Sequence, residues 1–188
     1  MQLSIVSYLD EAATGQIRQL QQAMSEVTGS RASLDSWAPH VTLADGVEVE
    51  MSEFDGFVDE VRRLADVTQP FGLTVTGFSS LDNRPIGVGE ESTPYAIFID
   101  VVSNAALLDL VAQLHIATRT RPIWYHMPQP YLPHVTLAFR DLSASGYAKG
   151  LTYLDDKHVE LQAQIDHVAL VQKLPNTDEE VVRLRFGS

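Results

Sequence analysis

Apolar and polar positions alternate at the start of the chain and then change to a helical spacing. The run from Leu3 to Leu9 predicts a strand. The following segment predicts a helix that starts at Asp10 and stops at Gly29, with apolar positions at Ile17, Leu20, Met24 and Val27. Further on, the pattern predicts a second helix from about Ser52 to Ala65, with an N-cap near Ser52, and a strand over 70–78.

The second half of the chain repeats this order of elements. A segment rich in Gly, Pro and Ser, 79–94, predicts a loop or crossover between the halves. A strand over 95–102 and a helix capped by Asn104 follow. Residues 143–154 favour a helix that Gly146 and Gly150 weaken, and the chain closes with two strands, a bent or bulged one over 159–174 and another over 181–186.

This repetition predicts the fold class. We expect an α+β protein formed by a bilobal, pseudo-two-fold duplication, with two antiparallel sheets lining a central groove and helices outside. A length of 188 residues suits a single domain over 1–188. Its lobes would span roughly 1–80 and 95–188, and strands could be exchanged between them.

The strongest signal is a repeated hexapeptide, Pro-His-Val-Thr-Leu-Ala, at residues 39–44 and 133–138. Residues two apart in a strand share a face, so His40 lies beside Thr42, and His134 beside Thr136. The intervening valine and leucine of each copy then point into the core. Each copy therefore presents one imidazole and one hydroxyl from a rigid strand.

Two imidazoles that face each other favour phosphodiester chemistry. One, neutral, takes a proton from the attacking water or hydroxyl, and the other, protonated, gives a proton to the leaving oxygen. The hydroxyls of Thr42 and Thr136 would hold the non-bridging phosphate oxygens. We expect neither a metal nor another cofactor, because two histidines fall short of the three protein ligands usual at a catalytic zinc.

Charge and composition narrow the range of partners. The chain has 13 basic and 25 acidic residues and a net charge of −12, so it should repel a long nucleic acid. A small nucleotide or an RNA end with a cyclic phosphate is the expected substrate. No cysteine, signal peptide or membrane-spanning stretch is evident, which favours a cytoplasmic protein.

Other residues are weaker candidates for substrate contact. Three aromatic side chains before the second motif could stack on a base, although packing under the proline-rich loop is as good an interpretation: Trp124, Tyr125 and Tyr131. Lys173 could contact phosphate, and Arg84 could close over a ligand, against the alternative of solvated surface charge. His126, in the same loop, could assist, against the alternative of a surface role. Three further histidines have no duplicated counterpart and are interpreted as structural or exposed: His115, His158 and His167.

At His40-Val41-Thr42 and His134-Val135-Thr136, 94 residues apart, the chain resembles the 2H phosphoesterase superfamily, and in it the branch of 2′-5′ RNA ligase-like proteins and cyclic nucleotide phosphodiesterases. The resemblance implies His40 and His134 as the acid–base pair and the two threonines as phosphate anchors. It implies hydrolysis of 2′,3′-cyclic or related phosphodiesters, or 2′-5′ joining, in RNA processing. The direction of reaction and the division of acid and base roles stay open. The alternatives are a non-catalytic nucleotide- or phosphate-binding module and a structural relic.

Overall fold

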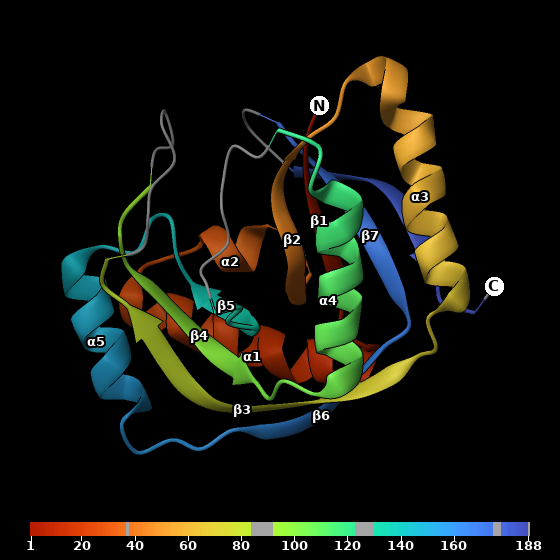
Figure 1. Cartoon of the computed structure of the whole chain (residues 1–188). Helices are drawn as coiled ribbons and strands as arrows, with labels where there is room; N and C mark the ends of the chain where they lie inside the picture. Colours follow the sequence, from red (N-terminus) through yellow and green to blue (C-terminus); the bar gives the residue numbers. More distant parts are fainter. Residues whose placement is uncertain (37, 84–91, 123–129, 175–177, 188) are drawn as a thin grey trace.

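Two four-stranded antiparallel sheets form the centre of the protein (Figure 1). The computed structural model describes residues 1–36, 38–83, 92–122, 130–174 and 178–187. The first sheet has the order β2-β1-β7-β8, with bounds His40–Glu48, Gln2–Tyr8, His167–Lys173 and Asp178–Arg185. The second has the order β5-β4-β3-β6, with bounds His134–Ala138, Ala96–Val101, Phe71–Leu81 and Glu160–Ile165.

Helices cover both sheets, and one helix of each half packs on the strand that carries the other half's copy of the motif. The helices are α1 (Glu11–Thr28), α2 (Ala32–Asp35), α3 (Phe54–Val67), α4 (Ala105–Thr118) and α5 (Ala144–Leu154), with a 3₁₀ turn, η1, at Met51–Glu53. The first-half helix α1 packs on β5 and β6, whereas the second-half helix α4 packs on β2. α3 adds to the cover of the first sheet and α5 to that of the second.

The strands are exchanged in the same way. The first half supplies β1 and β2 to the first sheet but β3 to the second. The second half supplies β4 and β5 to the second sheet but β7 to the first. The predicted fold class, α+β with two antiparallel sheets related by a pseudo-two-fold duplication, is confirmed.

Local signals place both ends of α1 and the start of α4 as predicted. The Asp10 side chain accepts a hydrogen bond from the Ala13 amide, and Gly29 ends α1 in the left-handed conformation, at φ 77°. Asn104 caps α4 in the same manner. The predicted cap at Ser52 is wrong, because Ser52 lies inside η1 and α3 begins at Phe54 without a side-chain cap.

The prediction of one bent strand over 159–174 is also wrong. The segment forms two strands that end and begin around Asp166, β6 in the second sheet and β7 in the first. β6 alternates between exposed and buried residues, whereas the first five residues of β7 are all buried. The change of sheet, rather than a bulge, explains the change of pattern.

Two glycines that weakened the prediction of α5 are required by its packing. A Cβ on Gly146 would lie 2.6 Å from the Thr28 carbonyl oxygen, and one on Gly150 would lie 2.5 Å from Cδ1 of Ile97. The glycines therefore let α5 approach α1 and β4 more closely than a side chain allows.

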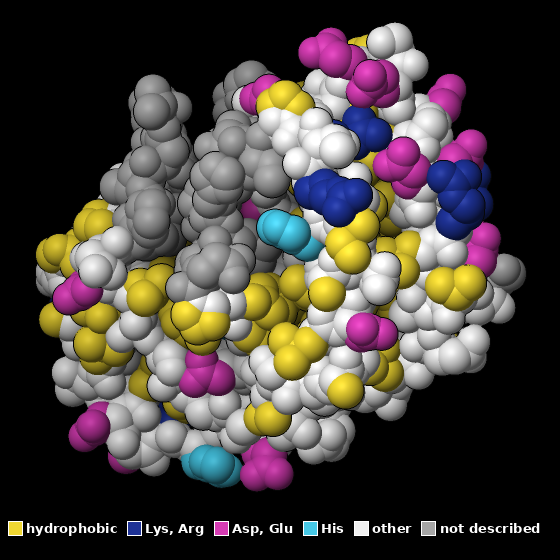
Figure 2. Space-filling model, viewed as in Figure 1, with side chains coloured by type: hydrophobic (Ala, Val, Ile, Leu, Met, Phe, Trp, Pro, Cys, Tyr) yellow, Lys and Arg dark blue, Asp and Glu magenta, His cyan; other side chains and the backbone are white. Residues whose placement is uncertain are grey.

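Charge is unevenly spread over the surface. Acidic side chains gather over α3 and the turn before it, at the upper right of Figure 2, and exposed members of this group are Glu50, Glu53, Asp55 and Asp59. In the described part of the chain, no helix is long and apolar enough to cross a membrane.

Candidate active site

The two motif copies occupy equivalent strands, β2 and β5, at the outer edges of their sheets. His40 and His134 are the first residues of these strands and pair with Tyr8 of β1 and Asp100 of β4. The valine and leucine of each copy are buried, as the alternation predicts: Val41, Leu43, Val135 and Leu137. β2 and β5 contact each other across the two sheets, which brings segments 94 residues apart in the sequence together.

Both imidazoles are held by the same backbone contact. Nδ1 of His40 lies 2.9 Å from the Ala38 carbonyl oxygen, and Nδ1 of His134 lies 2.8 Å from the Leu132 carbonyl oxygen. Because a carbonyl only accepts, each Nδ1 carries the proton and donates it. In the neutral ring Nε2 then holds the lone pair, so both histidines are fixed in one tautomer.

The surroundings favour the neutral form of both histidines. Burial lowers the pKa of His40 to about 4, and the hydrogen bond to the Ala38 carbonyl opposes this shift. The positive charges of Lys173 and His134 lower the pKa further, and the carboxylate of Asp178 raises it. Burial also lowers the pKa of His134, and there the carboxylate of Asp100 opposes the shift. The charge of one imidazole is felt by the other, so the two rings share one electrostatic environment.

An aromatic ring backs each histidine. Tyr8 meets His40 edge-on, with ring centroids 6.2 Å apart and planes at 80°. Phe98 of β4 packs on His134 at 4.6 Å. Both contacts come from the strand next to the motif strand, as the duplication requires.

Each motif strand is also braced by a residue from the other half of the chain. The Tyr131 hydroxyl donates to the Thr42 carbonyl oxygen at 2.8 Å, and the Gln21 side-chain amide donates to the Thr136 carbonyl oxygen at 2.9 Å. Gln21 is buried on α1, where a polar residue on an apolar helix face was the only sequence signal. Sequence reasoning did not find this residue.

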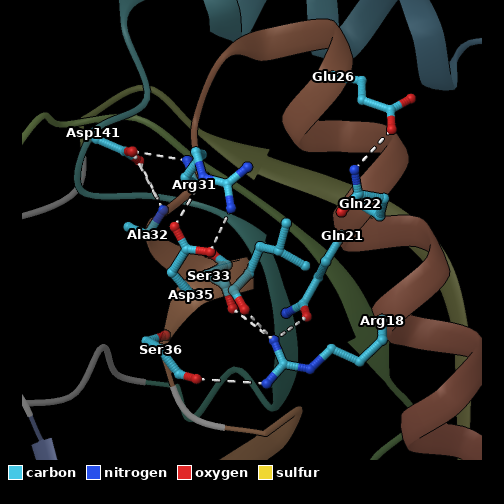
Figure 3. A network of polar contacts seen from close by, with 11 residues as sticks. Arg18, Gln21, Gln22, Glu26, Arg31, Ala32, Ser33, Asp35, Ser36 and Asp141 are labelled. Atoms are coloured by element: carbon cyan, nitrogen blue, oxygen red, sulfur yellow. Dashed lines mark hydrogen bonds and ion pairs between the residues drawn. The ribbon is translucent and has the colours of Figure 1, made fainter.

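Gln21 belongs to a polar network that fixes the approach to the first motif (Figure 3). Arg18 donates to the Gln21 side-chain oxygen at 3.1 Å and to the Leu34 carbonyl oxygen at 2.7 Å. Asp141, which follows the second motif, accepts from the Ser30 hydroxyl at 2.6 Å and the Arg31 amide at 2.8 Å. Side chains around both motifs thus hold the same segment, 30–36.

The structure describes two of the five weaker candidates for substrate contact, Lys173 and Tyr131. Lys173 lies near His40 and pairs with the largely buried carboxylate of Asp178 at 3.6 Å, and Arg140 reaches the same carboxylate at 3.6 Å. Tyr131 contacts the first motif through the bond described above. Trp124, Tyr125 and Arg84 lie outside the described residues.

A hollow elsewhere on the described surface is poorly suited to a phosphate. A hollow of about 860 Å³ is lined by none of the motif residues, and its charged lining, Arg121 apart, is acidic: Glu48, Glu50, Glu53 and Glu60. Such a lining repels phosphate. Among the described residues, no three His, Asp or Glu side chains are grouped to hold a metal ion.

Known proteins resemble this chain in sequence, and solved structures resemble it in fold. The chain is 29% identical over 139 residues to a "Putative phosphoesterase" of Geobacillus thermodenitrificans, covering 73% of this chain and 72% of the relative. A protein of the same name from Halalkalibacterium halodurans is 28% identical over 138 residues, covering 73% and 72%.

Solved structures extend the likeness over the whole fold. Protein TT0787 of Thermus thermophilus has a TM-score of 0.70 at 20% identity and covers 100% of this chain and 99% of that one. E. coli LigT in complex with 3′-AMP has a TM-score of 0.64 at 15% identity, covering 100% and 98%. The sequence model of the 2′-5′ RNA ligase superfamily matches residues 9–177. The expected resemblance is confirmed, and the chain belongs to the 2′-5′ RNA ligase superfamily, whose members act on phosphoesters.

Proposed function

We propose that the protein is a metal-independent phosphoesterase that opens 2′,3′-cyclic or related cyclic phosphodiesters, or cleaves 2′-5′ linkages, of small nucleotides or RNA ends. The observation that carries this proposal is the matched pair of histidines. His40 and His134 come from duplicated strands, are held in one tautomer by equivalent carbonyls, and interact electrostatically. A base and an acid around one phosphorus atom need this arrangement.

The charges around the two rings favour different roles for them. Lys173 opposes protonation of His40, which suits a base that starts neutral. Asp100, the cross-strand partner of His134, favours protonation there, which suits an acid. Asp100 is itself oriented by the Ser79 hydroxyl, which donates to its carboxylate at 2.5 Å.

Hydrolysis of a 2′,3′-cyclic phosphate would then proceed in one in-line step. Nε2 of His40 takes a proton from water as the water oxygen bonds to phosphorus. The bond from phosphorus to one ribose oxygen breaks, and His134 gives its proton to that oxygen. The product is a phosphomonoester. Thr42 and Thr136 would donate to the non-bridging oxygens, where negative charge must be stabilised.

Charge and fold both favour a small substrate. Lys173 brings a positive charge close to His40 in a chain of net charge −12. LigT, which shares the fold, has been crystallised with 3′-AMP, ATP and phosphate. A nucleotide is therefore a reasonable ligand. We propose Lys173, Tyr131, Trp124, Tyr125 and Arg84 as further substrate contacts.

Turnover of 2′,3′-cyclic nucleotides, with identification of the product, tests the proposal. His40→Ala and His134→Ala should each lower the rate by about 10²–10⁴-fold, the usual effect of removing an acid or base. His158→Ala is the matched control, because that side chain is 78% exposed. Full activity in both motif variants would refute the mechanism. Binding of 3′-AMP without turnover of any cyclic or 2′-5′ substrate would instead favour the non-catalytic module.

A further inference from the structure

A row of three rings runs across the first sheet from the candidate base to a buried histidine. His40 on β2, Tyr8 on β1 and His167 on β7 are cross-strand neighbours, because β1 pairs with both other strands. Tyr8 meets His40 edge-on and stacks on His167, with centroids 5.8 Å apart and planes at 29°. The sequence predicts a structural or exposed role for His167, and the residue is 6% exposed.

Tyr8 is held on several sides. The Arg183 guanidinium carbon lies 5.0 Å from the centre of its ring, and Glu180 accepts a hydrogen bond from its hydroxyl. Burial, followed by the negative charge of Glu180, raises the pKa of Tyr8 to about 12. The side chain therefore stays an uncharged phenol near neutral pH, with its hydroxyl engaged by Glu180.

The His167 ring, on which Tyr8 stacks, is held by polar contacts of its own. Nδ1 of His167 lies 2.6 Å from the carboxylate of Asp166, and the Ser7 hydroxyl donates to the His167 carbonyl oxygen at 2.7 Å. Asp166 sits where the chain passes from the second sheet to the first, between β6 and β7. Nε2 of His167 has no hydrogen-bond partner within the described residues, although it is buried. A buried polar atom without a hydrogen bond lowers the stability of the folded protein, so a contribution to stability does not explain why a histidine stands at position 167.

The other half of the duplication lacks this arrangement. There Phe98 packs directly on His134, and Phe98 is itself fully buried. A residue that merely filled space beside a motif histidine would need no polar support. The Asp166–His167 pair is therefore a feature by which the surroundings of His40 differ from those of His134.

We infer that Tyr8, seated on the Asp166–His167 pair, is the positioning residue for the His40 imidazole. The backbone bond to Ala38 holds one nitrogen of His40, and the Tyr8 ring meets the imidazole edge-on. The Tyr8 contact thus helps to keep Nε2 directed toward the phosphate. This inference rests on the proposed function, in which His40 transfers the proton.

Steady-state kinetics with a 2′,3′-cyclic nucleotide test the inference. Tyr8→Leu should lower kcat by about 10–100-fold with little change in KM, because a displacement near 1 Å costs rates of that order. Tyr8→Phe keeps the ring and should restore kcat to within about 3-fold of wild type. His167→Leu should act in the same direction as Tyr8→Leu, and His158→Leu, on an exposed histidine, should not.

Two outcomes would overturn the inference. Wild-type kcat in Tyr8→Leu would show that His40 needs no ring beside it. Equal losses in Tyr8→Phe and Tyr8→Leu would show that the hydroxyl acts, not the ring. If Tyr8→Leu does not fold, Asp166→Asn replaces it, because Asp166 is 55% exposed. An unchanged kcat in that variant would show that the Asp166–His167 pair does not hold Tyr8 in its catalytic position.

A readout without turnover separates this inference from the proposed function. The imidazole signals of His40 in the NMR spectrum should shift or broaden in Tyr8→Leu and stay unchanged in Tyr8→Phe. A wild-type protein inactive on every cyclic and every 2′-5′ substrate would refute the proposed function alone. Identical His40 signals in wild type and Tyr8→Leu would refute the positioning role alone.

Discussion

The side-chain amide of Gln21 donates a hydrogen bond to the carbonyl oxygen of Thr136, 2.9 Å away and 115 residues later in the chain. The Tyr131 hydroxyl makes the reciprocal contact with the Thr42 carbonyl oxygen. Each motif strand is thus fixed by the half that does not contain it. The relative position of the two histidines depends on these bonds as well as on the sheets.

Replacing Gln21 by leucine should lower the free energy of unfolding by about 1–3 kcal/mol, because the carbonyl of Thr136 loses the partner that the buried Gln21 supplies. Urea denaturation measures the change. Gln22→Leu is the matched control, since the exposed side chain of the neighbouring Gln22 donates to Glu26 at the surface of α1, 2.7 Å away (Figure 3). Equal stabilities of the two variants would show that the brace contributes nothing.

The close approach of α5 gives a second test of stability. Gly150→Ala should destabilise the protein by about 1–3 kcal/mol, because the new methyl group would overlap Ile97. Gly15→Ala, inside α1, meets no atom within 4 Å and should stabilise by up to about 1 kcal/mol. Thermal melting of both variants checks the opposite signs, and a loss in both would contradict the packing argument.

Local signals were sufficient for the elements and the motif faces. Asp10 and Asn104 cap helices through contacts within three residues, so the sequence alone reveals them. The burial of Val41 and Leu43 follows from the period of a strand. For the same reason the residue pairs of both motifs could be assigned to common faces.

Contacts between distant segments could not be predicted. The passage between sheets at Asp166 looks like a bulge in the sequence, because a single residue separates the two strands. Gly150 reads as a helix breaker until the approach of Ile97 is known. Tyr8, His167 and Gln21 act through partners that no single segment contains, and only the sheet order brings them to the motifs.

The lowered pKa of His40 predicts how stability depends on pH. The native ring has a pKa of about 4 and the unfolded one 6.5, so the unfolded state binds more protons between these values. The stabilising contribution is therefore complete above 6.5 and is lost as pH falls toward 4, at up to about 1.4 kcal/mol per pH unit. In urea denaturation, the difference between wild type and His40→Gln should shrink over this range. A pH-independent difference would contradict a neutral, buried His40.

Binding of a phosphate should protonate one of the two motif histidines. Both imidazoles are neutral near pH 7 in the free protein, because burial lowers the pKa of each. A phosphate between them adds negative charge that raises the pKa of a nearby histidine, and Asp100 directs the proton to His134. Calorimetry of 3′-AMP binding, in two buffers of different ionisation enthalpy, should therefore show proton uptake approaching about one per site.

The proton uptake also distinguishes the two histidines. His134→Gln should lose the uptake that exceeds the ligand's own protonation, whereas His40→Gln should keep most of it, because the carboxylate of Asp100 remains beside His134. Asp100→Asn should reduce uptake without removing either imidazole. If His40→Gln loses the uptake and His134→Gln keeps it, the acid and base roles proposed for the two rings are reversed, although the pair itself stands. If ligand binds and neither variant changes the uptake, the phosphate does not lie between the histidines.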